Sequence, residues 1–278
     1  MSSATGRIDD VSENTVTHPA PGTQIDVAEV PNLRDLGGWQ TADGRTVARG
    51  LVFRGTHLNR AAGTPVAELG LGAIVDLRRE AERAANPDAP LAPVIVADVF
   101  GDRPTEGDID MVALLADPPA LVAATNGLAA DEVTRHMTNA YRGFVAPGAA
   151  TTAFRTLLGT IAHADAPVLF HCSAGKDRTG WGAAVLLQLL GVPIATVERE
   201  YLLTNEQFLP ALGPGFEAFA RHGGDLEMLR AVLGVRLTYL HAALDAMTST
   251  FGDVETYATR GLGLSDDSLT RLRERLLV

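Results

Sequence analysis

One stretch of the sequence combines a nucleophile with the pattern of an anion-binding loop. Residues 168–187 contain Cys172, the only cysteine among 278 residues, and Lys176, the only lysine. Five residues separate Cys172 from Arg178, which gives the pattern C-x5-R, and Thr179 follows directly. A thiolate is a strong nucleophile, and the guanidinium fork of an arginine fits the oxygens of a tetrahedral dianion. The spacing therefore predicts a phosphate-binding loop built around a nucleophilic sulfur.

The elements on either side of this loop are those that an anion site needs. Apolar Val168–His171 is predicted to form a buried strand, and a helix is predicted from Thr179 onward. The positive end of the helix dipole and successive backbone N–H groups would then face a bound anion and favour the thiolate form of Cys172. Gly175 lets the backbone approach the phosphate oxygens because it has no Cβ. The predicted phosphate-binding residues are Ser173, Ala174, Gly175, Lys176, Asp177 and Arg178.

Two neighbours of the loop have predicted supporting roles. The hydroxyl group of Thr179 can donate a hydrogen bond to the sulfur and so stabilise it as nucleophile and as leaving group. The ring of His171 can fix the loop by bonding to backbone carbonyl groups, which is a structural role and not that of a base. The competing interpretation is an inert, buried Cys172 with Arg178 in a surface ion pair. That interpretation gives no reason for a lysine and an arginine packed around a thiol.

The rest of the chain alternates apolar strands with helices, which predicts an α/β fold. We expect a central, mostly parallel sheet flanked by helices and covered on both faces. Polar residues 1–22 are predicted to be a disordered tail, and residues 23–278 a single domain. Within that domain, residues 100–128 have two interpretations, a two-helix insertion packed on the core or a mobile lid over the site.

Local patterns place the individual elements. A first β-hairpin region is predicted up to residue 55, with residues 46–54 as a strand. Further strands are predicted at residues 73–77 and in an apolar run centred on residues 94–96. A broken helical stretch is expected over residues 206–234. Helices are predicted at residues 65–71, 79–85, 131–144, 150–163 and 179–190, from residue 193, and at residues 237–250 and 269–277.

Composition excludes several classes of protein and of site. The formal net charge is -11, so nucleic acid is not an expected partner. A single cysteine excludes a disulfide framework and a multi-cysteine metal site, and the histidines lack metal-ligand spacing, so no metal or other cofactor is expected. Neither a signal peptide nor an apolar span of about 20 residues is visible. Because a lone thiol fits a reducing compartment, we expect a cytoplasmic protein, or one exported without a recognisable signal peptide. The oligomeric state stays open.

The loop also resembles a known family. The sequence H-C-S-A-G-K-D-R-T-G of residues 171–180 resembles the signature loop of cysteine-dependent protein tyrosine phosphatases. Its Lys-Asp pair before the arginine is similar to one branch, the bacterial atypical tyrosine-protein phosphatases of dual-specificity and lipid-phosphatase character, which has mycobacterial members. Further matches to that branch are the segments 32–38, 53–54 (followed by Gly55 where the branch has a serine), 76–78, 191–192 and 201–205. The matches start near residue 25 and end near residue 205, so the resemblance covers most of the chain that is predicted to be ordered.

The resemblance implies a two-step reaction that needs no metal. Cys172 attacks phosphorus to form a phosphocysteine, an acid protonates the leaving oxygen, and water hydrolyses the intermediate. In the better-known tyrosine phosphatases the acid is the aspartate of a Trp-Pro-Asp loop, but neither tryptophan of this chain precedes Pro-Asp. The related branch implies Asp177, with Asp76 and then Asp98 as further candidates. The alternative role for Asp177 is an ion pair with an arginine.

Several basic residues have two open roles each. A lysine in such a loop also occurs in phosphatases that act on phosphoinositides, so Lys176 either contacts further phosphate groups or is a solvated charge. Arg34, Arg54 and Arg78 either line the mouth of the site or form ion pairs with aspartates near them in the sequence. For surface arginines an ion pair is the more common arrangement.

The expected partner is a phosphorylated protein or a phosphoinositide substrate. Phosphotyrosine is the first substrate hypothesis, with phosphoserine, phosphothreonine and phosphoinositides open. One alternative is a sulfurtransferase of rhodanese type, whose loops usually lack the His-Cys and Arg-Thr frame. The other is a non-catalytic module that binds phosphorylated ligands, against which the intact Cys172, Arg178 and Thr179 argue.

Overall fold

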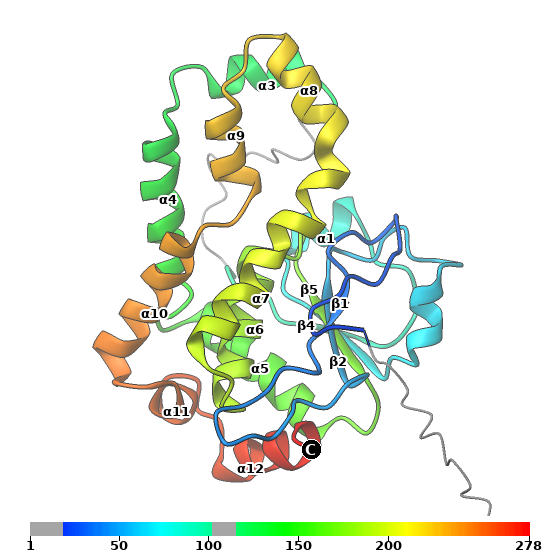
Figure 1. Cartoon of the computed structure of the whole chain (residues 1–278), viewed down its shortest axis with the longest axis vertical. Helices are drawn as coiled ribbons and strands as arrows, with labels where there is room; N and C mark the ends of the chain where they lie inside the picture. The colour runs from blue at the N-terminus through cyan, green and yellow to red at the C-terminus, as the bar shows by residue number, and fades with distance from the viewer. Residues whose placement is uncertain (1–18, 102–114) are drawn as a thin grey trace, which may run out of the picture.

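A five-stranded sheet lies at the centre of the computed structural model, which describes residues 19–101 and 115–278. Its order is β1-β2-β5-β3-β4, in which β1 runs antiparallel to β2 and the other neighbours are parallel. Helices flank the sheet (Figure 1). The predicted α/β fold with a central, mostly parallel sheet is therefore confirmed. The strands are β1 (Arg34–Asp35), β2 (Val52–Gly55), β3 (Ala73–Asp76), β4 (Val94–Val96) and β5 (Val168–His171).

The central strand β5 is buried on both faces. Val168 and Phe170 belong to the larger apolar core, whereas Leu169 between them belongs to a smaller core on the other face. This division follows from the alternation of side chains along a strand. A continuous apolar run, without alternating polar residues, is therefore what this position in a parallel sheet requires.

Helices cover the larger core, whereas the smaller core is closed by irregular segments. The smaller core includes Val30, Leu58 and Val66, the last of which lies on the short 3-10 helix η1 (Pro65–Leu69). Both faces are thus covered as predicted, but only one of them by long helices. The helices with buried side chains in the larger core include α5 (Ala149–His163), α6 (Asp177–Leu189), α7 (Ile194–Gln207), α10 (Leu237–Phe251) and α12 (Asp266–Leu276).

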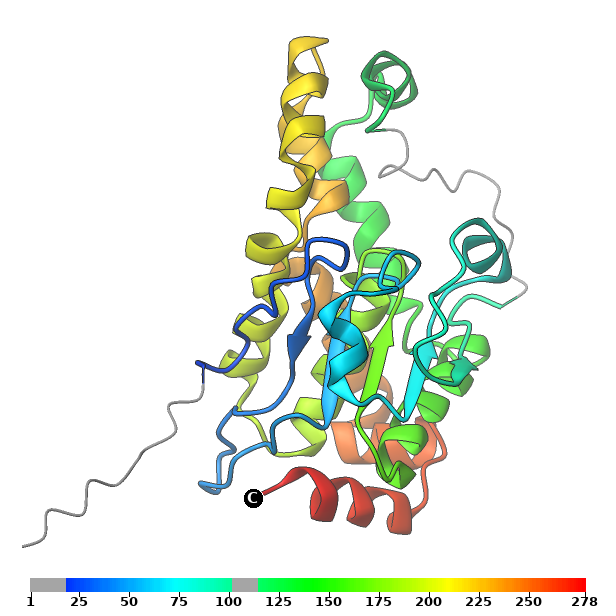
Figure 2. The ribbon, with the colours of Figure 1, turned by 90° about the vertical axis from the view of Figure 1, so that its right-hand side faces the viewer.

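Four helices stand away from the sheet and share a third apolar core. They are α3 (Pro118–Thr125), α4 (Ala130–Arg142), α8 (Gly213–Arg221) and α9 (Leu226–Leu233), which we call the helical extension. Leu121, Phe219 and Leu229 are buried between them. Figure 2 shows the extension rising beyond the edge at which the parallel strands end. The helical extension therefore lies at the same edge of the sheet as the cysteine loop.

The predicted elements agree with the structure except for the length or the start of three of them. The predicted strand over residues 46–54 is wrong in length, because Gly50 adopts a positive φ of 72° and strand β2 begins only at Val52. The predicted helix at residues 65–71 is the shorter η1. Helix α6 begins at Asp177, two residues before the predicted start. The remaining elements are α1 (Glu80–Ala85), η2 (Leu209–Leu212), α11 (Val254–Thr256) and the π-helical turn η3 (Tyr257–Gly261).

Some predictions fall partly outside the described residues. The predicted tail of residues 1–22 is described only from residue 19. Of the predicted insertion of residues 100–128, residues 102–114 lie outside the described residues. The described part of that insertion contains α3, which begins at Pro118. In the part of the chain that the structure describes, no helix has the length and apolar character to cross a membrane.

Candidate active site

The cysteine loop, residues 172–178, lies where three parallel strands end together. In the sheet register, His171 at the end of β5 is level with Gly55 of β2 and Asp76 of β3. Cys172 follows at once and is buried, with 2% of its surface exposed. The carboxyl edge of a parallel sheet is where α/β proteins place their sites. The predicted strand, loop and helix are thus present around the cysteine.

Gly175 is the tightest point of the loop. Its φ is +64°, a conformation that favours glycine, and an added Cβ would lie 2.1 Å from the carbonyl oxygen of Gly55. The loop therefore passes directly over the end of β2. A side chain at this position would force the loop off the sheet and change the path of its N–H groups.

A cluster of buried charged side chains binds the backbone of the loop. The carbonyl oxygen of Gly175 accepts hydrogen bonds from Arg54 Nη2 at 2.8 Å and from Asn32 Nδ2 at 2.9 Å. Glu200 on α7 pairs with Arg54 at 2.8 Å and with Arg34 at 2.7 Å, and all three side chains are buried. Burial raises the pKa of Glu200, but the charges of Arg34 and Arg54 outweigh it and leave the pKa below its usual value. Arg54 therefore supports the loop.

The ion pairs differ from those expected of these arginines. Arg34 pairs with Glu200 and not with the adjacent Asp35, whose carboxylate accepts backbone N–H groups of Gly37 and Gly50. Two arginines around one buried glutamate provide the compensation that a buried charge requires. These two arginines lie beneath the loop and not at its mouth.

His171 connects the loop to a second buried cluster. Its Nδ1 lies 3.0 Å from the carbonyl oxygen of Cys172, as the predicted structural role requires. Its Nε2 lies 3.1 Å from Asp88 Oδ2, and Arg78 contacts Asp88 at 2.8 Å and Asp76 at 2.7 Å. The expected pairing of Arg78 with Asp76 is therefore present.

The same cluster is the candidate for a metal site among the described residues. Ligand atoms of Asp76, Asp88 and His171 lie within 4.8 Å of one another. The guanidinium group of Arg78 already bonds to both carboxylates, through two nitrogens in the case of Asp76. This cation supplies the charge that a metal would bring, so the residues present do not fit a metal.

Glu82 on α1 holds Arg178 in place. Its Oε2 accepts a hydrogen bond of 2.7 Å from Nη1 of Arg178, and its Oε1 accepts one of 2.7 Å from Nη2. Oε1 also accepts a hydrogen bond from the hydroxyl of Ser173. Burial raises the pKa of Glu82, but the bonds and charge of Arg178 outweigh this and lower the pKa to about 2. Among the described residues, Nε of Arg178 has no hydrogen-bond partner. Nε and the second N–H of Nη2 could therefore donate together to a bidentate anion.

An aromatic ring faces the same guanidinium group. The centroid of the Phe100 ring lies 5.0 Å from the guanidinium carbon of Arg178 and 4.5 Å from that of Arg79. Such contacts are attractive because the ring face carries negative charge density. Arg178 is thus fixed by a carboxylate at its tip and by a ring on its face.

Lys176 turns toward the helical extension. Its ammonium donates to the carbonyl oxygen of Val232 at 2.5 Å, with that of Gly234 at 3.5 Å, and it pairs with Asp177 at 3.0 Å. Only 8% of the residue is exposed, so the solvated charge that was one of its two predicted roles is wrong. The cation lies at the carbonyl end of α9, where a helix dipole favours positive charge.

Asp177 is held from the other side by two tyrosines. Its Oδ1 accepts a hydrogen bond of 2.9 Å from the hydroxyl of Tyr141, which lies 2.7 Å from the hydroxyl of Tyr201. Burial, and next the charge of Asp177, raise the pKa values of both tyrosines well above the usual value, so both stay protonated. The ion pair of Asp177 is made with Lys176 and not with an arginine.

The other residues proposed from the sequence have these positions. Thr179 is buried, and its hydroxyl has no hydrogen-bond partner among the described residues, so the predicted bond to the sulfur of Cys172 is not formed. Asp76 is buried and bonded to Arg78. Asp98 accepts the backbone N–H groups of Phe100 and Gly101. The structure thus brings only Asp177, of the three candidate acids, into the loop itself.

Sequence analysis missed the partners that hold the loop. Glu82, Tyr141, Tyr201, Asp88 and Glu200 each contact a loop residue or a residue that bonds to the loop. Tyr201 falls within a segment that resembled the bacterial branch, and that match was the available signal. The others have no local pattern, because their partners lie far away in the sequence.

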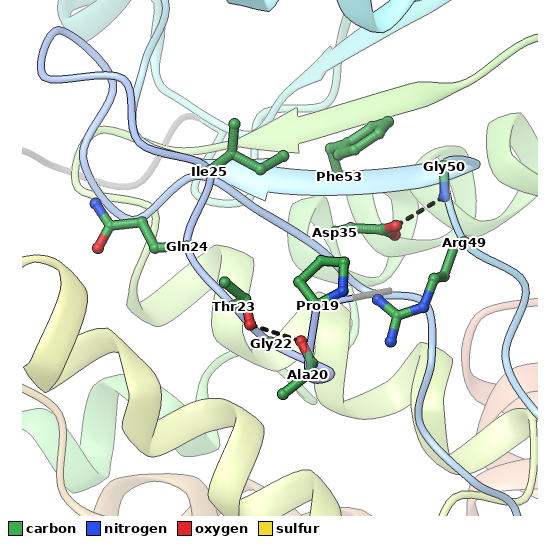
Figure 3. Close-up of a pocket in the computed structure, with 10 residues that line it drawn as sticks. All are labelled: Pro19, Ala20, Gly22, Thr23, Gln24, Ile25, Asp35, Arg49, Gly50 and Phe53. Carbon is green, nitrogen blue, oxygen red and sulfur yellow. Dashed lines mark hydrogen bonds between the residues drawn. The ribbon is translucent and has the colours of Figure 1, made fainter. Parts of the chain in front are cut away.

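One cavity among the described residues lies away from the cysteine loop. It has a volume of about 370 Å³ and lies beside β1 and β2 (Figure 3). Its lining includes Pro19, Ile25, Arg49 and Phe53, and no residue of the cysteine loop. The chemistry of this protein is therefore not assigned to this cavity.

Comparison with known proteins identifies the family. The sequence profile described as "Tyrosine phosphatase family" matches residues 25–278. This chain belongs to the tyrosine phosphatase family. It is therefore a phosphomonoester hydrolase of the cysteine-dependent tyrosine phosphatase type, as the loop predicted, and neither the sulfurtransferase nor the non-catalytic alternative is supported.

Two curated bacterial relatives align over most of the chain. The "triple specificity protein phosphatase PtpB" of Mycobacterium tuberculosis is 29% identical and covers 90% of this chain and 99% of its own. A putative tyrosine-protein phosphatase of Cupriavidus necator is 30% identical, over 82% of this chain and 80% of its own. The crystal structure of TpbA from P. aeruginosa has 19% identity and a TM-score of 0.30, over 70% of this chain and 96% of that one. The predicted resemblance to the bacterial atypical branch is confirmed.

Proposed function

We propose that this phosphatase works through a phosphocysteine on Cys172 and that phosphotyrosine in proteins is its first substrate. The observation that carries the proposal is the position of Arg178. Its guanidinium group is fixed by Glu82 beside the buried cysteine, and one edge of the fork stays open. A tetrahedral phosphate bound there would present its phosphorus atom to the sulfur.

The proposed first step divides the work among loop residues. Cys172 attacks phosphorus while Arg178 and the backbone N–H groups of residues 173–178 bind the three oxygens that do not leave. Asp177 gives its proton to the leaving oxygen. In the second step the carboxylate of Asp177 takes a proton from water, which displaces the sulfur from phosphorus. The free hydroxyl of Thr179 then donates to the departing thiolate.

Two contacts favour Asp177 over the other candidate acids. Asp76 is buried and takes part in a two-nitrogen contact with Arg78, so it has no path to a leaving group. Asp98 is used by the backbone of its own segment. Asp177 lies next to Arg178 in the loop and is partly exposed, with 20% of its side chain accessible.

The substrate range is proposed to extend beyond phosphotyrosine. One relative is named for triple specificity, which supports a test on phosphoserine, phosphothreonine and phosphoinositides as well. Lys176 stays a candidate for contact with a further phosphate of a phosphoinositide. That use would exchange the carbonyl oxygens of Val232 and Gly234 for phosphate oxygens.

A reduced Cys172 is a requirement of this chemistry. The thiolate is both nucleophile and leaving group, and oxidation would stop turnover. We therefore propose a reducing compartment such as the cytoplasm as the place of action. Fractionation of the cells that make the protein tests this, since recovery of active enzyme only outside the cells would contradict it.

Hydrolysis of p-nitrophenyl phosphate by purified, reduced protein tests the proposal. We expect turnover in the presence of a chelator, and complete loss in Cys172→Ser. Turnover that persists in Cys172→Ser would overturn the assignment of the nucleophile. Hydrolysis of phosphotyrosine peptides at a lower kcat/KM than every other member of the substrate panel would overturn the assignment of the first substrate.

A further inference from the structure

Two buried tyrosines form an ordered pair behind the proposed acid. Tyr141 comes from α4 and Tyr201 from α7, and neither side chain is exposed. Their rings meet edge to face with centroids 6.4 Å apart. Burying two phenol groups is costly unless their hydroxyls are bonded. Here both hydroxyls are satisfied in one chain that ends on Asp177.

The direction of the hydrogen bonds in this chain is determined by its end. The hydroxyl of Tyr141 donates to Oδ1 of Asp177, which accepts as a carboxylate oxygen and also as the carbonyl oxygen of an acid protonated on Oδ2. A phenol has a single proton, and Tyr141 has used it. In the hydrogen bond of 2.7 Å between the two hydroxyls, Tyr201 must therefore be the donor and Tyr141 the acceptor. The chain runs from Tyr201 to Tyr141 to Asp177.

This direction distinguishes the two oxygens of Asp177. Oδ1 is occupied by a donor that cannot turn away without leaving a buried hydroxyl unpaired. Oδ2 lies 3.0 Å from Lys176, whose ammonium occupies one of its two lone pairs, and the carboxyl group keeps part of its surface exposed. A proton on the second lone pair of Oδ2 keeps the bond from Tyr141 to Oδ1 and the contact with Lys176 intact.

We propose that Tyr141, ordered by Tyr201, is a positioning residue that makes Oδ2 of Asp177 the atom that gives and takes the proton. The inference rests on the proposed acid role of Asp177 and deepens it. Neither tyrosine touches the substrate. Both act by fixing the rotation of the carboxyl group, so that the proton faces the leaving oxygen and not the protein interior.

The proton balance of both steps follows from this assignment. In the first step the bond from Cys172 Sγ to phosphorus forms, the bond from phosphorus to the ester oxygen breaks, and the proton moves from Oδ2 to that oxygen. In the second step a water oxygen bonds to phosphorus, the phosphorus–sulfur bond breaks, and one water proton moves to Oδ2. The enzyme then has its thiolate and its protonated Asp177 again.

The test compares three tyrosine-to-phenylalanine variants on substrates with good and poor leaving groups. Tyr141→Phe and Tyr201→Phe each remove one hydroxyl and keep the ring. Tyr239→Phe is the matched control, because Tyr239 is also buried and packs 5.9 Å from Tyr141, but its hydroxyl bonds to the carbonyl oxygen of Ala231. Unfolding temperatures show that all variants are folded under assay conditions.

We expect Tyr141→Phe to lower kcat/KM about tenfold for phenyl phosphate, the substrate with the poor leaving group, because the hydrogen bond that fixes the carboxyl group of Asp177 is lost. The loss on p-nitrophenyl phosphate should stay within about twofold, since a good leaving group needs little protonation. Tyr201→Phe should give a smaller loss of the same kind. Added to Tyr141→Phe, it should cause no further loss, because Tyr201 acts only through Tyr141.

The split between kcat and KM gives a readout that a structural role would not move. Loss of the Tyr141 hydroxyl should slow the proton transfer and leave phosphate binding by Arg178 unchanged. For phenyl phosphate, kcat should therefore fall in Tyr141→Phe with little change in KM, and neither should change in Tyr239→Phe. Equal losses on both substrates, or the same loss in Tyr239→Phe, would overturn the inference.

Asp177→Asn separates this inference from the proposed function. If the loss of kcat/KM in Asp177→Asn depends on the leaving group but the loss in Tyr141→Phe does not, the acid role of Asp177 is correct and the positioning role of Tyr141 is wrong. If Asp177→Asn shows no such dependence, both the acid role and the positioning role are overturned. If both variants show it and the control does not, both are supported.

Discussion

The two flanks of the cysteine loop hold their central side chains with different partners. On one flank, Arg178 is held by a full charge, the carboxylate of Glu82, and by the ring of Phe100. On the other, Asp177 is held by a neutral hydroxyl and by a lysine that is shared with α9. The flank proposed to bind phosphate thus keeps the charge of Arg178 in a fixed place. In the proposed mechanism Asp177 gains and loses a proton on Oδ2, while the hydroxyl of Tyr141 stays bonded to Oδ1.

This contrast predicts that substitutions on the two flanks have different effects. Substitutions on the Arg178 flank should reduce kcat/KM for all phosphate esters by the same factor. For substitutions on the Asp177 flank, the loss of kcat/KM should depend on the leaving group. The substitutions that follow test this distinction.

The largest effect is expected from Arg178→Lys. It keeps the positive charge but loses the two-pronged contact, and we expect kcat/KM to fall about a thousandfold, as when a stabilising donor of a transition state is removed. Phenyl phosphate and p-nitrophenyl phosphate should lose the same factor. A loss of only a few fold would show that charge alone suffices and that the fork of Arg178 is not used.

Asp177→Asn should come next. General acid catalysis contributes about a hundredfold or more, so the loss of kcat/KM on phenyl phosphate should be of that order. On p-nitrophenyl phosphate the loss should be about tenfold smaller. The ratio of the two losses is the measurement, and a ratio of one would assign Asp177 to the structure of the loop.

Glu82→Gln should have a smaller effect that is uniform across leaving groups. The amide keeps one acceptor for Arg178 but loses the charge, and we expect a fall of about tenfold in kcat/KM, mostly through KM. Glu198→Gln is the matched control, since Glu198 pairs with His241 and not with a residue of the loop. An unchanged KM in Glu82→Gln would contradict the proposed fixing of Arg178.

The stability of the same variant should respond to pH in a defined way. The pKa of Glu82 is about 2 in the folded protein, below the 4.5 of the free side chain. Its contribution to stability is therefore complete above pH 4.5 and is lost as the pH falls toward 2. Over this range the unfolding temperature of Glu82→Gln should fall less steeply than that of the wild type. Parallel curves would show that the ion pair adds no stability.

Lys176→Ala should have the smallest effect on simple esters. The ammonium stabilises the carbonyl end of α9 by about 1 kcal/mol at most, so a small fall of the unfolding temperature is expected. If the lysine also binds a second phosphate, kcat/KM should fall about tenfold more on a phosphoinositide than on a phosphotyrosine peptide. Equal losses on both would limit its role to holding α9 and Asp177.

The contrast between the flanks also explains what could be predicted from the sequence. The strand, the cysteine, Gly175, Arg178 and the helix are adjacent in the chain, so their spacing predicted the loop. The apolar run of β5 similarly predicted a buried, parallel strand. Local order in the sequence carries this information, because each element needs only its neighbours to be recognised.

The partners of the loop could not be predicted in that way. Glu82 lies 96 residues before Arg178, and Tyr141 lies 36 residues before Asp177. A charged residue in a short helix and a tyrosine in an amphipathic one have many possible partners. Only the packing of α1 and α4 against the loop selects these two, and nothing in the local pattern reports that packing. The same reason accounts for Glu200, whose bonds to Arg34 cross 166 residues.

Cys172 is the proposed nucleophile of the whole reaction, and its covalent intermediate provides the most direct test. Enzyme quenched in acid during turnover of p-nitrophenyl phosphate would be digested and its peptides weighed by mass spectrometry. We predict a phosphate group on the peptide that contains Cys172, more of it in Asp177→Asn if release by water becomes slower than attack, and none in Cys172→Ser. A phosphorylated peptide from elsewhere in the chain, or active enzyme that never carries phosphate on Cys172, would contradict the account.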